Sequence, residues 1–209
     1  MKLIKLLVIS NLMLLSTFFT ASTLASDINL NPDQVVKSVM QKITDRLKGK
    51  QEYYKKNPKE LNQEAQKLLK ELKPNLDLAR MSWSIVGSAW RGASKDDKRA
   101  FISEFKTLLI NTYISSLLDY VNHKIVYKPY RKIPNKKHAV IRSFAISDKN
   151  TKLPITYKLY QSKKYGWRIY DVTVVGVSLV RSYKSSFKET LRKSALIGLT
   201  DTLKKKNAK

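Results

Sequence analysis

Apolar side chains recur every three to four residues through the first half of the chain, which is the spacing of one face of an α-helix. Asn31-Pro32 predicts a helix over about 33–48, because Asn caps helix N-termini and Pro fits the first helical position. Asn57-Pro58 repeats this signal, and Pro74 stops the apolar run that follows, which predicts a second helix over about 59–72.

Two further helices follow from the same spacing. A short apolar run from Leu78 ends at Gly87, a residue type common at helix C-termini. Ser94, with Asp97 three residues later, resembles a capping box and opens a long fourth helix of about 20 residues. We expect one apolar stripe along this helix, made of Phe101, Phe105, Leu109, Tyr113, Leu117 and Tyr120.

From Lys124 on, the apolar period changes to two, the spacing of one face of a β-strand. Four strands are expected, marked by Val126 and Tyr130, then Val140, Phe144 and Ile146, then Ile155, Tyr157 and Leu159, then Tyr170, Val172 and Val174. The connections, such as Asp148-Lys149-Asn150, are short, whereas parallel strands need long crossovers. The sheet is therefore expected to be antiparallel.

A last helix is predicted from about Leu179 to near Leu203. Its apolar side consists of Val180, Tyr183, Phe187 and Leu191, and the next residue after each of these forms a basic ridge, Arg181, Lys184, Lys188 and Arg192. Helices followed by strands and a final helix indicate an α+β fold, with about four antiparallel strands covered on one face by about five helices. No repeat or linker divides the chain, so we expect a single domain.

Composition and charge narrow the chemistry. The 209 residues include no cysteine, which excludes disulfides, a thiolate nucleophile and cysteine-ligated metal sites. The 41 basic side chains face only 16 acidic ones, so an anionic partner is expected: nucleic acid, an acidic protein or a membrane surface.

The first 25 residues have the pattern of a secretory signal peptide. Lys2 and Lys5 precede a largely apolar stretch over 6–19, and Thr23-Leu24-Ala25 offers small residues for cleavage after Ala25. A membrane anchor is the alternative, but a spanning helix needs about 20 apolar residues and this stretch is interrupted by polar ones. We therefore expect a mature chain of residues 26–209 outside the cytoplasm. Its 39 basic and 16 acidic side chains give a net charge of +23, and outside the cytoplasm a lipid or membrane is a better anionic partner than nucleic acid.

Motifs for catalysis are weak. Gly176-Val177-Ser178 could begin a nucleophile elbow, but Val180 stands where the closing glycine belongs. The two histidines, His123 and His138, lie among lysines and are interpreted as surface residues rather than as a catalytic base or metal ligands. Asp171 lies inside an apolar strand and is expected to pair with a basic side chain rather than to act in catalysis. No catalytic residue and no metal ligand is assigned.

Three stretches of the chain resemble the MlaC family, also called the toluene-tolerance family. They are Ile85-Val86-Gly87-Ser88-Ala89-Trp90-Arg91-Gly92-Ala93-Ser94, then Phe101-x-x-x-Phe105-x-x-Leu108-Leu109-x-x-x-Tyr113, and above all Trp167-x-Ile169-Tyr170-Asp171-Val172-x-x-x-Gly176-Val177-Ser178-Leu179-Val180. The resemblance extends over essentially the whole mature chain. The chain departs from the family in being more basic and in having Trp83 and Trp90 where smaller or other aromatic residues are expected.

The resemblance implies a periplasmic phospholipid carrier and not an enzyme. Such a carrier would pass lipid between an outer-membrane lipoprotein–porin complex and an inner-membrane ABC transporter with an MCE-domain subunit, and so maintain outer-membrane lipid asymmetry. The implied fold is a curved antiparallel sheet wrapped by helices, with an apolar cavity between them for the acyl tails. The implied cargo is phospholipid, with no cofactor, no metal and no nucleic acid, and we expect a monomer.

The energetics of such a cargo agree with an apolar cavity. Two acyl tails have about 30 methylenes, and exposing them to water would cost on the order of 20 kcal/mol. The residues expected to line the cavity are Leu78, Met81, Ile85, Phe105, Leu109, Tyr113, Leu117, Val140, Ile155, Tyr157, Tyr170, Val172, Val174, Val177 and Val180. For each of them, ordinary packing in the core is the open alternative.

Two other classes of protein remain as alternatives. A secreted basic module that binds another anionic or apolar ligand would explain the charge, although a nucleic-acid surface would need aromatic residues interleaved with the lysines. A periplasmic hydrolase would need a general base, which the two histidines barely provide.

Overall fold

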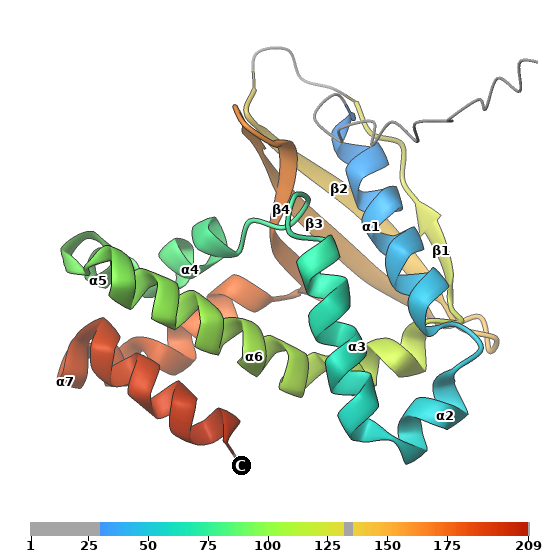
Figure 1. Cartoon of the computed structure of the whole chain (residues 1–209). Helices are drawn as coiled ribbons and strands as arrows, with labels where there is room; N and C mark the ends of the chain where they lie inside the picture. The colour runs from blue at the N-terminus through green and yellow to red at the C-terminus, as the bar shows by residue number, and fades with distance from the viewer. Residues whose placement is uncertain (1–29, 132–135, 209) are drawn as a thin grey trace, which may run out of the picture.

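The computed structural model describes residues 30–131 and 136–208 and has the predicted α+β architecture (Figure 1). The predicted signal peptide, residues 1–25, lies outside the described residues. The helices are α1 (Pro32–Leu47), α2 (Gln51–Lys56), α3 (Pro58–Glu71), α4 (Leu78–Val86), α5 (Ser88–Gly92), α6 (Lys95–Tyr120) and α7 (Leu179–Asn207). The strands are β1 (Lys124–Tyr127), β2 (His138–Ile146), β3 (Lys152–Ser162), β4 (Gly166–Val174) and β5 (Val177–Ser178).

The first four predicted helices are confirmed as α1, α3, α4 and α6, and their start signals act as expected. At α1 the backbone N–H of Asn31 donates to Oε1 of Gln34 at 2.8 Å. At α6 the N–H of Asp97 donates to Oγ of Ser94 at 3.0 Å, and the Ser94 N–H donates back to the Asp97 carboxylate at 3.2 Å. The helices α2 and α5 were not predicted, because runs of six and five residues are too short to show a helical period.

The sheet is antiparallel, as predicted, and its strands are neighbours in chain order from β1 to β5. The four predicted strands correspond to β1–β4, while the two-residue β5 was not predicted. Tyr130, one of the markers of the first strand, lies outside β1. A meander of this kind needs only tight turns, which is why short connections suffice.

The face of β2 that packs against the helices is not the one that the predicted markers occupy. Ala139, Ile141 and Ala145 are buried, whereas Val140 is exposed and Phe144 and Ile146 are only half-buried on the opposite face. Both faces of β2 carry apolar residues, so the period of two does not determine which face is inside. Packing decides the choice, because Ala139 and Ile141 belong to one buried cluster with valines of α1.

A β-bulge in β4 also shifts the predicted pattern. Tyr157 pairs with Val172 and Leu159 pairs with Ile169, so one residue of β4, Tyr170, has no partner in the register. Residues directly opposite one another lie on the same face, and Val172 therefore shares a face with Ile169 rather than with Tyr170. The predicted row of Tyr170, Val172 and Val174 on one face is wrong at its first member.

Apolar packing forms three clusters. The sheet cluster joins α1 and α3 to β2, β3 and β4 through residues such as Val36, Leu72 and Leu159. The helical cluster joins α4, α6 and α7, and the corner cluster joins the ends of α1, α2, α3 and α6. In Figure 1, α1 lies across the sheet, α4, α5 and α7 are grouped away from it, and α6 reaches from that group toward the sheet. The chain thus has separate cores in its sheet half and its helical half.

Asp171, whose pairing with a basic side chain is confirmed, joins the two halves. Its buried carboxylate accepts from Nζ of Lys158 at 3.0 Å, from Oγ of Ser178 at 2.8 Å and from the backbone N–H of Val180 at 3.1 Å. Oγ of Ser178 in turn accepts from the N–H of Arg181 at 3.2 Å and caps α7. The strand β4 therefore holds the first turn of α7 in a fixed place.

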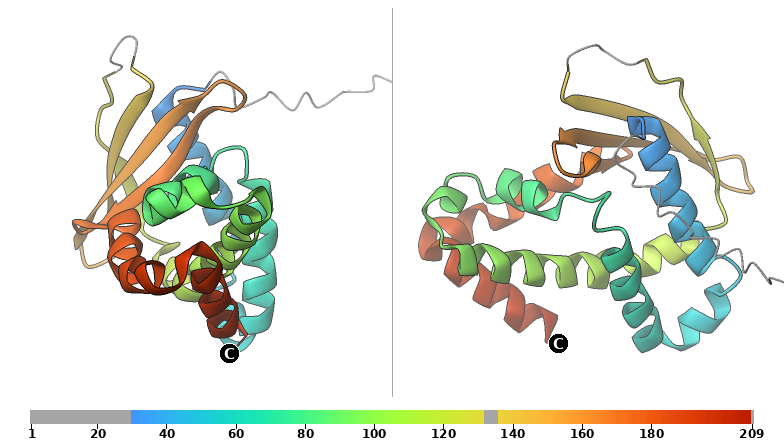
Figure 2. Two further views of the ribbon diagram at one scale, coloured as in Figure 1. Left: turned by 90° about the vertical axis from the view of Figure 1, so that its left-hand side faces the viewer. Right: turned by 45° about the horizontal axis from the view of Figure 1, so that its top comes forward.

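The last helix is not continuous, contrary to the prediction. Its backbone leaves the helical conformation at Ser194 and Ala195, the latter with φ 52°, and α7 runs away from the sheet and then turns back (Figures 1 and 2). Phe187 before the break and Leu196, Leu199 and Leu203 after it pack in the helical cluster. One straight helix could not bring both sets to the same core, and this explains the break.

Removing the carboxylate of Asp171 tests the joint between the halves. Asp171→Ala should lower the free energy of unfolding by about 3 kcal/mol, because Ser178 and the α7 N-terminus lose a charged acceptor. Ser178→Ala should cost about 1 kcal/mol as a lost cap. Urea denaturation of both variants, the double variant and the exposed control Asp148→Ala gives the four values.

The two single costs should not add, because both variants break the same Ser178–Asp171 hydrogen bond. Full additivity, or an Asp171→Ala variant as stable as the Asp148→Ala control, would contradict this account of the joint.

Candidate functional site

The helix α6 has apolar side chains on nearly every side, although a helix of a soluble protein needs only one apolar face. Phe101, Phe105 and Leu108 are buried in the helical cluster. Phe105 meets the ring of Tyr183 on α7 at 5.1 Å between centroids, and burial raises the pKa of Tyr183 to about 12. Further along, α6 turns another side to the corner cluster, where Ile110, Ile114 and Leu118 are buried.

A third side of α6, which we call the open face, is covered only in part: Leu109 packs against the helical cluster, while the residues after it are largely exposed. Its residues recur at spacings of three and four and are Ile102, Lys106, Leu109, Tyr113, Leu117 and Tyr120. Tyr113, Leu117 and Tyr120 are exposed although they are large and apolar. The stripe predicted for this helix therefore splits, because Phe101 and Phe105 are buried against helices while its later members belong to the open face.

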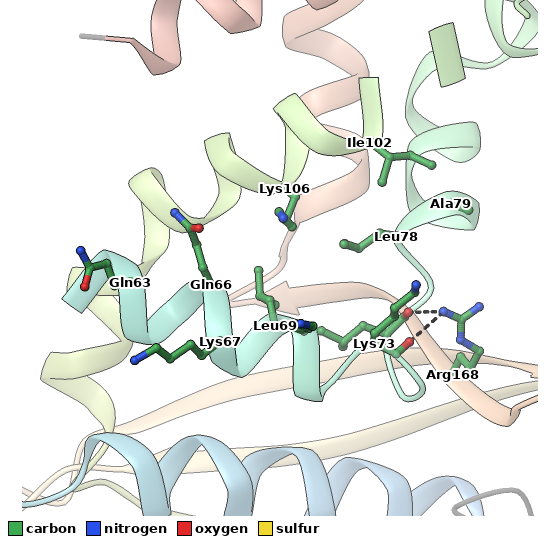
Figure 3. A pocket seen from close by; sticks show the side chains of 12 residues that line it. Gln63, Gln66, Lys67, Leu69, Lys73, Leu78, Ala79, Ile102, Lys106 and Arg168 are labelled. Atoms are coloured by element: carbon green, nitrogen blue, oxygen red, sulfur yellow. Dashed lines mark hydrogen bonds between the residues drawn. The ribbon is translucent and has the colours of Figure 1, made fainter. Parts of the chain in front are cut away.

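The start of the open face lines a pocket of about 750 Å³ between α3, α4 and α6 (Figure 3). Apolar residues line part of it, and these are Leu69, Leu76, Leu78, Ala79 and Ile102. Cationic residues line another part, and these are Lys67, Lys70, Lys73, Lys106 and Arg168. We call this site the basic pocket.

The cations of the basic pocket are not equivalent. Arg168 is used by the fold, because its guanidinium donates to the backbone carbonyls of Lys73, Pro74 and Leu76 and lies 3.2 Å from Oδ1 of Asp77. Within residues 30–131 and 136–208, the ammonium groups of Lys70, Lys73 and Lys106 have no ion pair within 4.0 Å. Three lysines are therefore free to bind an anion in this pocket.

The end of the open face lines a second space, which we call the sheet hollow, of about 190 Å³. It lies between α1, the end of α6 and the strands, and its lining is almost entirely apolar: Met40, Ile43, Leu117, Tyr120, Val121, Ile125, Ala145, Leu153, Ile155, Val174 and Val175, with Thr44 and His123 as the polar members. The register places Ile155 opposite Val174, so both belong to the face of the sheet that α1 covers.

One helix face thus connects the two spaces. Ile102 and Lys106 line the basic pocket, Leu117 and Tyr120 line the sheet hollow, and the open face continues between them. The arrangement offers a cationic site at one end and apolar surface along the rest. An amphiphile with an anionic head and apolar tails has the matching distribution of charge and apolar surface.

The structure separates the residues predicted to line a cavity into several groups. Leu78 lines the basic pocket, and Leu117, Ile155 and Val174 line the sheet hollow. Leu109 and Tyr113 lie on the open face between them, where Leu109 also packs against the helical cluster. Met81, Ile85, Phe105 and Val180 pack in the helical cluster, and Tyr157 and Val172 pack in the sheet cluster. Val140 and Tyr170 lie on the face of the sheet away from α1, and Val177 is exposed at the β4–β5 turn.

The lysines of the basic pocket were not among the predicted site residues. Lys67, Lys70 and Lys73 recur every three residues along α3 and its C-terminal end, which places them on one side, and Lys106 faces them from α6. That spacing is visible in the sequence, but among 41 basic residues it does not stand out. The contribution from α6 could be seen only in the folded chain.

The side chains considered for catalysis make contacts that belong to the fold. Oγ of Ser178 hydrogen-bonds with Asp171 and caps α7. The ring of His123 lies 4.9 Å from that of Tyr120, and the ring of His138 lies 5.2 Å from that of Tyr160. Over the two described ranges, no group of three His, Cys, Asp or Glu residues could hold a metal ion.

No helix in the part of the chain that the structure describes combines the length and the apolar character needed to cross a membrane.

Comparison with known proteins gives consistent results. The family model "MlaC protein" matches residues 37–205. The toluene tolerance protein ttg2D of Pseudomonas putida is 24% identical over 184 residues, which are 88% of this chain and 82% of that protein. The intermembrane phospholipid transport system binding protein MlaC of Haemophilus influenzae is 25% identical over 129 residues, 60% of each chain.

A solved structure has the same fold. The phospholipid-binding protein of Ralstonia solanacearum, determined in complex with a phospholipid, superposes with a TM-score of 0.74 at 24% identity and covers 86% of this chain and 98% of that one.

Neighbouring leucines on α6 test whether the open face is unfilled. Leu118 is 2% exposed in the corner cluster, while Leu117 is 38% exposed on the open face. Leu118→Ala should therefore lower the free energy of unfolding by about 2–5 kcal/mol, and Leu117→Ala by less than about 1 kcal/mol. Urea denaturation measures both, and equal costs would mean that the open face is packed like the core.

Proposed function

The chain belongs to the MlaC family, and from this membership we propose that it is a periplasmic carrier that binds phospholipid and moves it between the inner and outer membranes. The open face of α6, with a pocket at each end, carries the proposal. Large apolar side chains that stay exposed, as Tyr113, Leu117 and Tyr120 do, are unfavourable in water unless a ligand or partner covers them. Acyl tails are ligands of the required chemistry.

The sizes of the two spaces bear on how the lipid is held. About 30 methylenes fill about 900 Å³ if each takes roughly the volume of a water molecule. The basic pocket, at about 750 Å³, is within the range of roughly 300–1,000 Å³ usual for ligand sites. The sheet hollow, at about 190 Å³, has room for part of one tail. The tails therefore lie along the open face and take up space at both ends.

The basic pocket is the proposed site of the head group. A phosphate near Lys70, Lys73 and Lys106 would accept charge-assisted hydrogen bonds from three ammonium groups. Lysine is a point charge on a flexible stem and does not impose the bidentate geometry of arginine. Little selectivity among phospholipid head groups is therefore expected, and tail burial supplies most of the binding free energy.

The partners and the location follow from the family. The proposed donor and acceptor complexes are an inner-membrane ABC transporter with an MCE-domain subunit and an outer-membrane lipoprotein–porin complex. The pattern of residues 1–25 supports export, and cleavage after Ala25 would release the protein into the periplasm as a single domain. The protein acts as a monomeric carrier, its cargo is the phospholipid, and it needs no cofactor and no catalytic residue.

A charge placed on the open face tests the proposal. Native mass spectrometry of the purified mature chain, with analysis of its organic extract, should show bound phospholipid without added metal. Leu117→Glu should lower the bound fraction about tenfold, because a carboxylate among acyl tails is unpaired and desolvated. Leu117 is exposed without lipid, so this variant should still fold.

Ser115→Glu is the matched control, because Ser115 is exposed on the same helix but on a different side from the open face. It should retain lipid as the parent does. Co-purifying nucleic acid would favour the basic binding module, and ester turnover without bound lipid would favour a hydrolase. Equal lipid occupancy in folded Leu117→Glu and Ser115→Glu would exclude the open face as the site of the tails.

A further inference from the structure

The turn between β4 and β5 has a residue in a conformation that its side chain disfavours. Val175 has φ 49° and Gly176 has φ 81°, so both central residues of this two-residue turn lie in the left-handed region. Turns of this kind favour Asn-Gly, because Asn tolerates positive φ and Gly has no Cβ, whereas a β-branched residue there is strained. The N–H of Val175 donates to the carbonyl of Pro154 at 2.9 Å, which holds the turn against β3.

Burial does not compensate for this strain. Val174, Val175 and Val177 are 45%, 57% and 64% exposed, and together they form an apolar tip that we call the valine hairpin. A strained residue persists where the surroundings or the function require it. Since the side chain of Val175 projects into solvent for more than half its surface, packing within the fold gives little reason for a valine at this position.

Basic residues share the same end of the sheet. In the antiparallel register, Lys124 of β1 pairs with Ile146 of β2, and Ile146 pairs with Lys152 of β3. Val174 pairs with Ile155, three residues after Lys152, so the valine hairpin lies at this end too. Lys124 and Lys152 are exposed, as are Asp148 and Lys149 in the β2–β3 turn.

The sheet hollow also opens at this end. Val174 and Val175 line the hollow and are exposed at the same time, so they form part of its mouth. The valine hairpin therefore places apolar side chains at the entrance to a mostly apolar lining.

We propose that the valine hairpin is a membrane-contact site, at which Val175 and Val177 enter the interfacial region of an anionic bilayer while Lys124, Lys149 and Lys152 face its head groups. The proposal rests on the carrier function, because it names the surface at which the carrier meets its lipid source. Apolar tips flanked by lysines bind anionic lipid surfaces without needing a complementary shape.

Replacing the strained valine separates a structural role from a membrane role. Val175→Asn relieves the strain, because Asn-Gly is the preferred pair for this turn, and removes an apolar side chain from the tip. The melting temperature should stay the same or rise by a few degrees. Binding of the full mature chain to vesicles of phosphatidylethanolamine and phosphatidylglycerol, measured by flotation, should weaken about tenfold.

Ile197→Gln is the matched control, because Ile197 is as exposed as Val175, at 59%, but lies elsewhere in the fold. It belongs to the part of α7 after the break at Ser194 and Ala195. This variant should bind vesicles as the parent does. Lys149→Glu with Lys152→Glu should weaken binding to the anionic vesicles at low salt and change little at high salt, where charges are screened within a few ångströms.

Depth in the bilayer can be read directly, because the chain has no cysteine. Val177→Cys labelled with an environment-sensitive fluorophore should shift its emission to the blue on adding the anionic vesicles, and Ile197→Cys labelled in the same way should not. These readouts differ from lipid retention. A parent that co-purifies with phospholipid but does not bind vesicles would overturn the membrane site and leave the carrier function intact.

Four other results would also overturn the membrane site. Loss of stability in Val175→Asn would show that Val175 serves the fold. Unchanged vesicle binding of Val175→Asn, or no shift at residue 177, would show that the tip stays in water, as would binding that appears only when a membrane protein is present in the vesicles.

Discussion

The rest of the structure depends on the hydrogen bonds that the buried carboxylate of Asp171 accepts. This carboxylate lies on the sheet but accepts from Ser178 and from the first turn of α7, so one strand determines where the helical half begins. A buried carboxylate needs such partners, because a charge taken out of water without compensation is very unfavourable. Its partners are the ammonium of Lys158 and the donors at the N-terminus of α7, a position that attracts negative charge in any case. The position of α7, and through it of the helical cluster, is thus tied to the register of β4.

Two cores held together in this way leave a space that a single core would fill. The sheet cluster and the helical cluster are each packed from their own elements, and α6 passes from one half to the other. One side of α6 packs in the helical cluster and another packs in the corner cluster. The open face is the side that remains between them. The exposed Tyr113 and Leu117 are therefore a consequence of how the halves are joined, and not a local packing defect. Exposing this apolar surface to water is unfavourable, and covering it with acyl tails would remove that cost.

The sequence was sufficient for the fold class and for most of the longer elements, but not for the short elements α2, α5 and β5 or for which faces are buried. Caps such as Asn31 and Ser94 act over three or four residues, so they could be recognised in advance. The bulge at Tyr170 depends on pairing with β3, and the burial of Ile141 rather than Val140 depends on which face of the sheet α1 covers. The break in α7 follows from two stretches that share one core, as at Phe187 and Leu199. Candidate site residues were affected most, because Leu117 and Leu118 are adjacent leucines whose different roles are set by tertiary packing alone.

Charge and apolar surface act over different distances in this molecule, and that difference separates encounter from retention. A net charge of +23 on residues 26–209 attracts anionic surfaces from beyond contact, but salt screens it over about 8–10 Å. The exposed basic ridge of Arg181, Lys184 and Lys188 contributes to this field, whereas Arg192 is partly neutralised by Glu189 at 2.8 Å. Tails on the open face of α6 are held by burial of apolar surface. Burial acts only on contact, and salt does not screen it. A carrier built in this way can adjust how fast it meets a membrane by changing surface charge, without changing how firmly it holds its lipid.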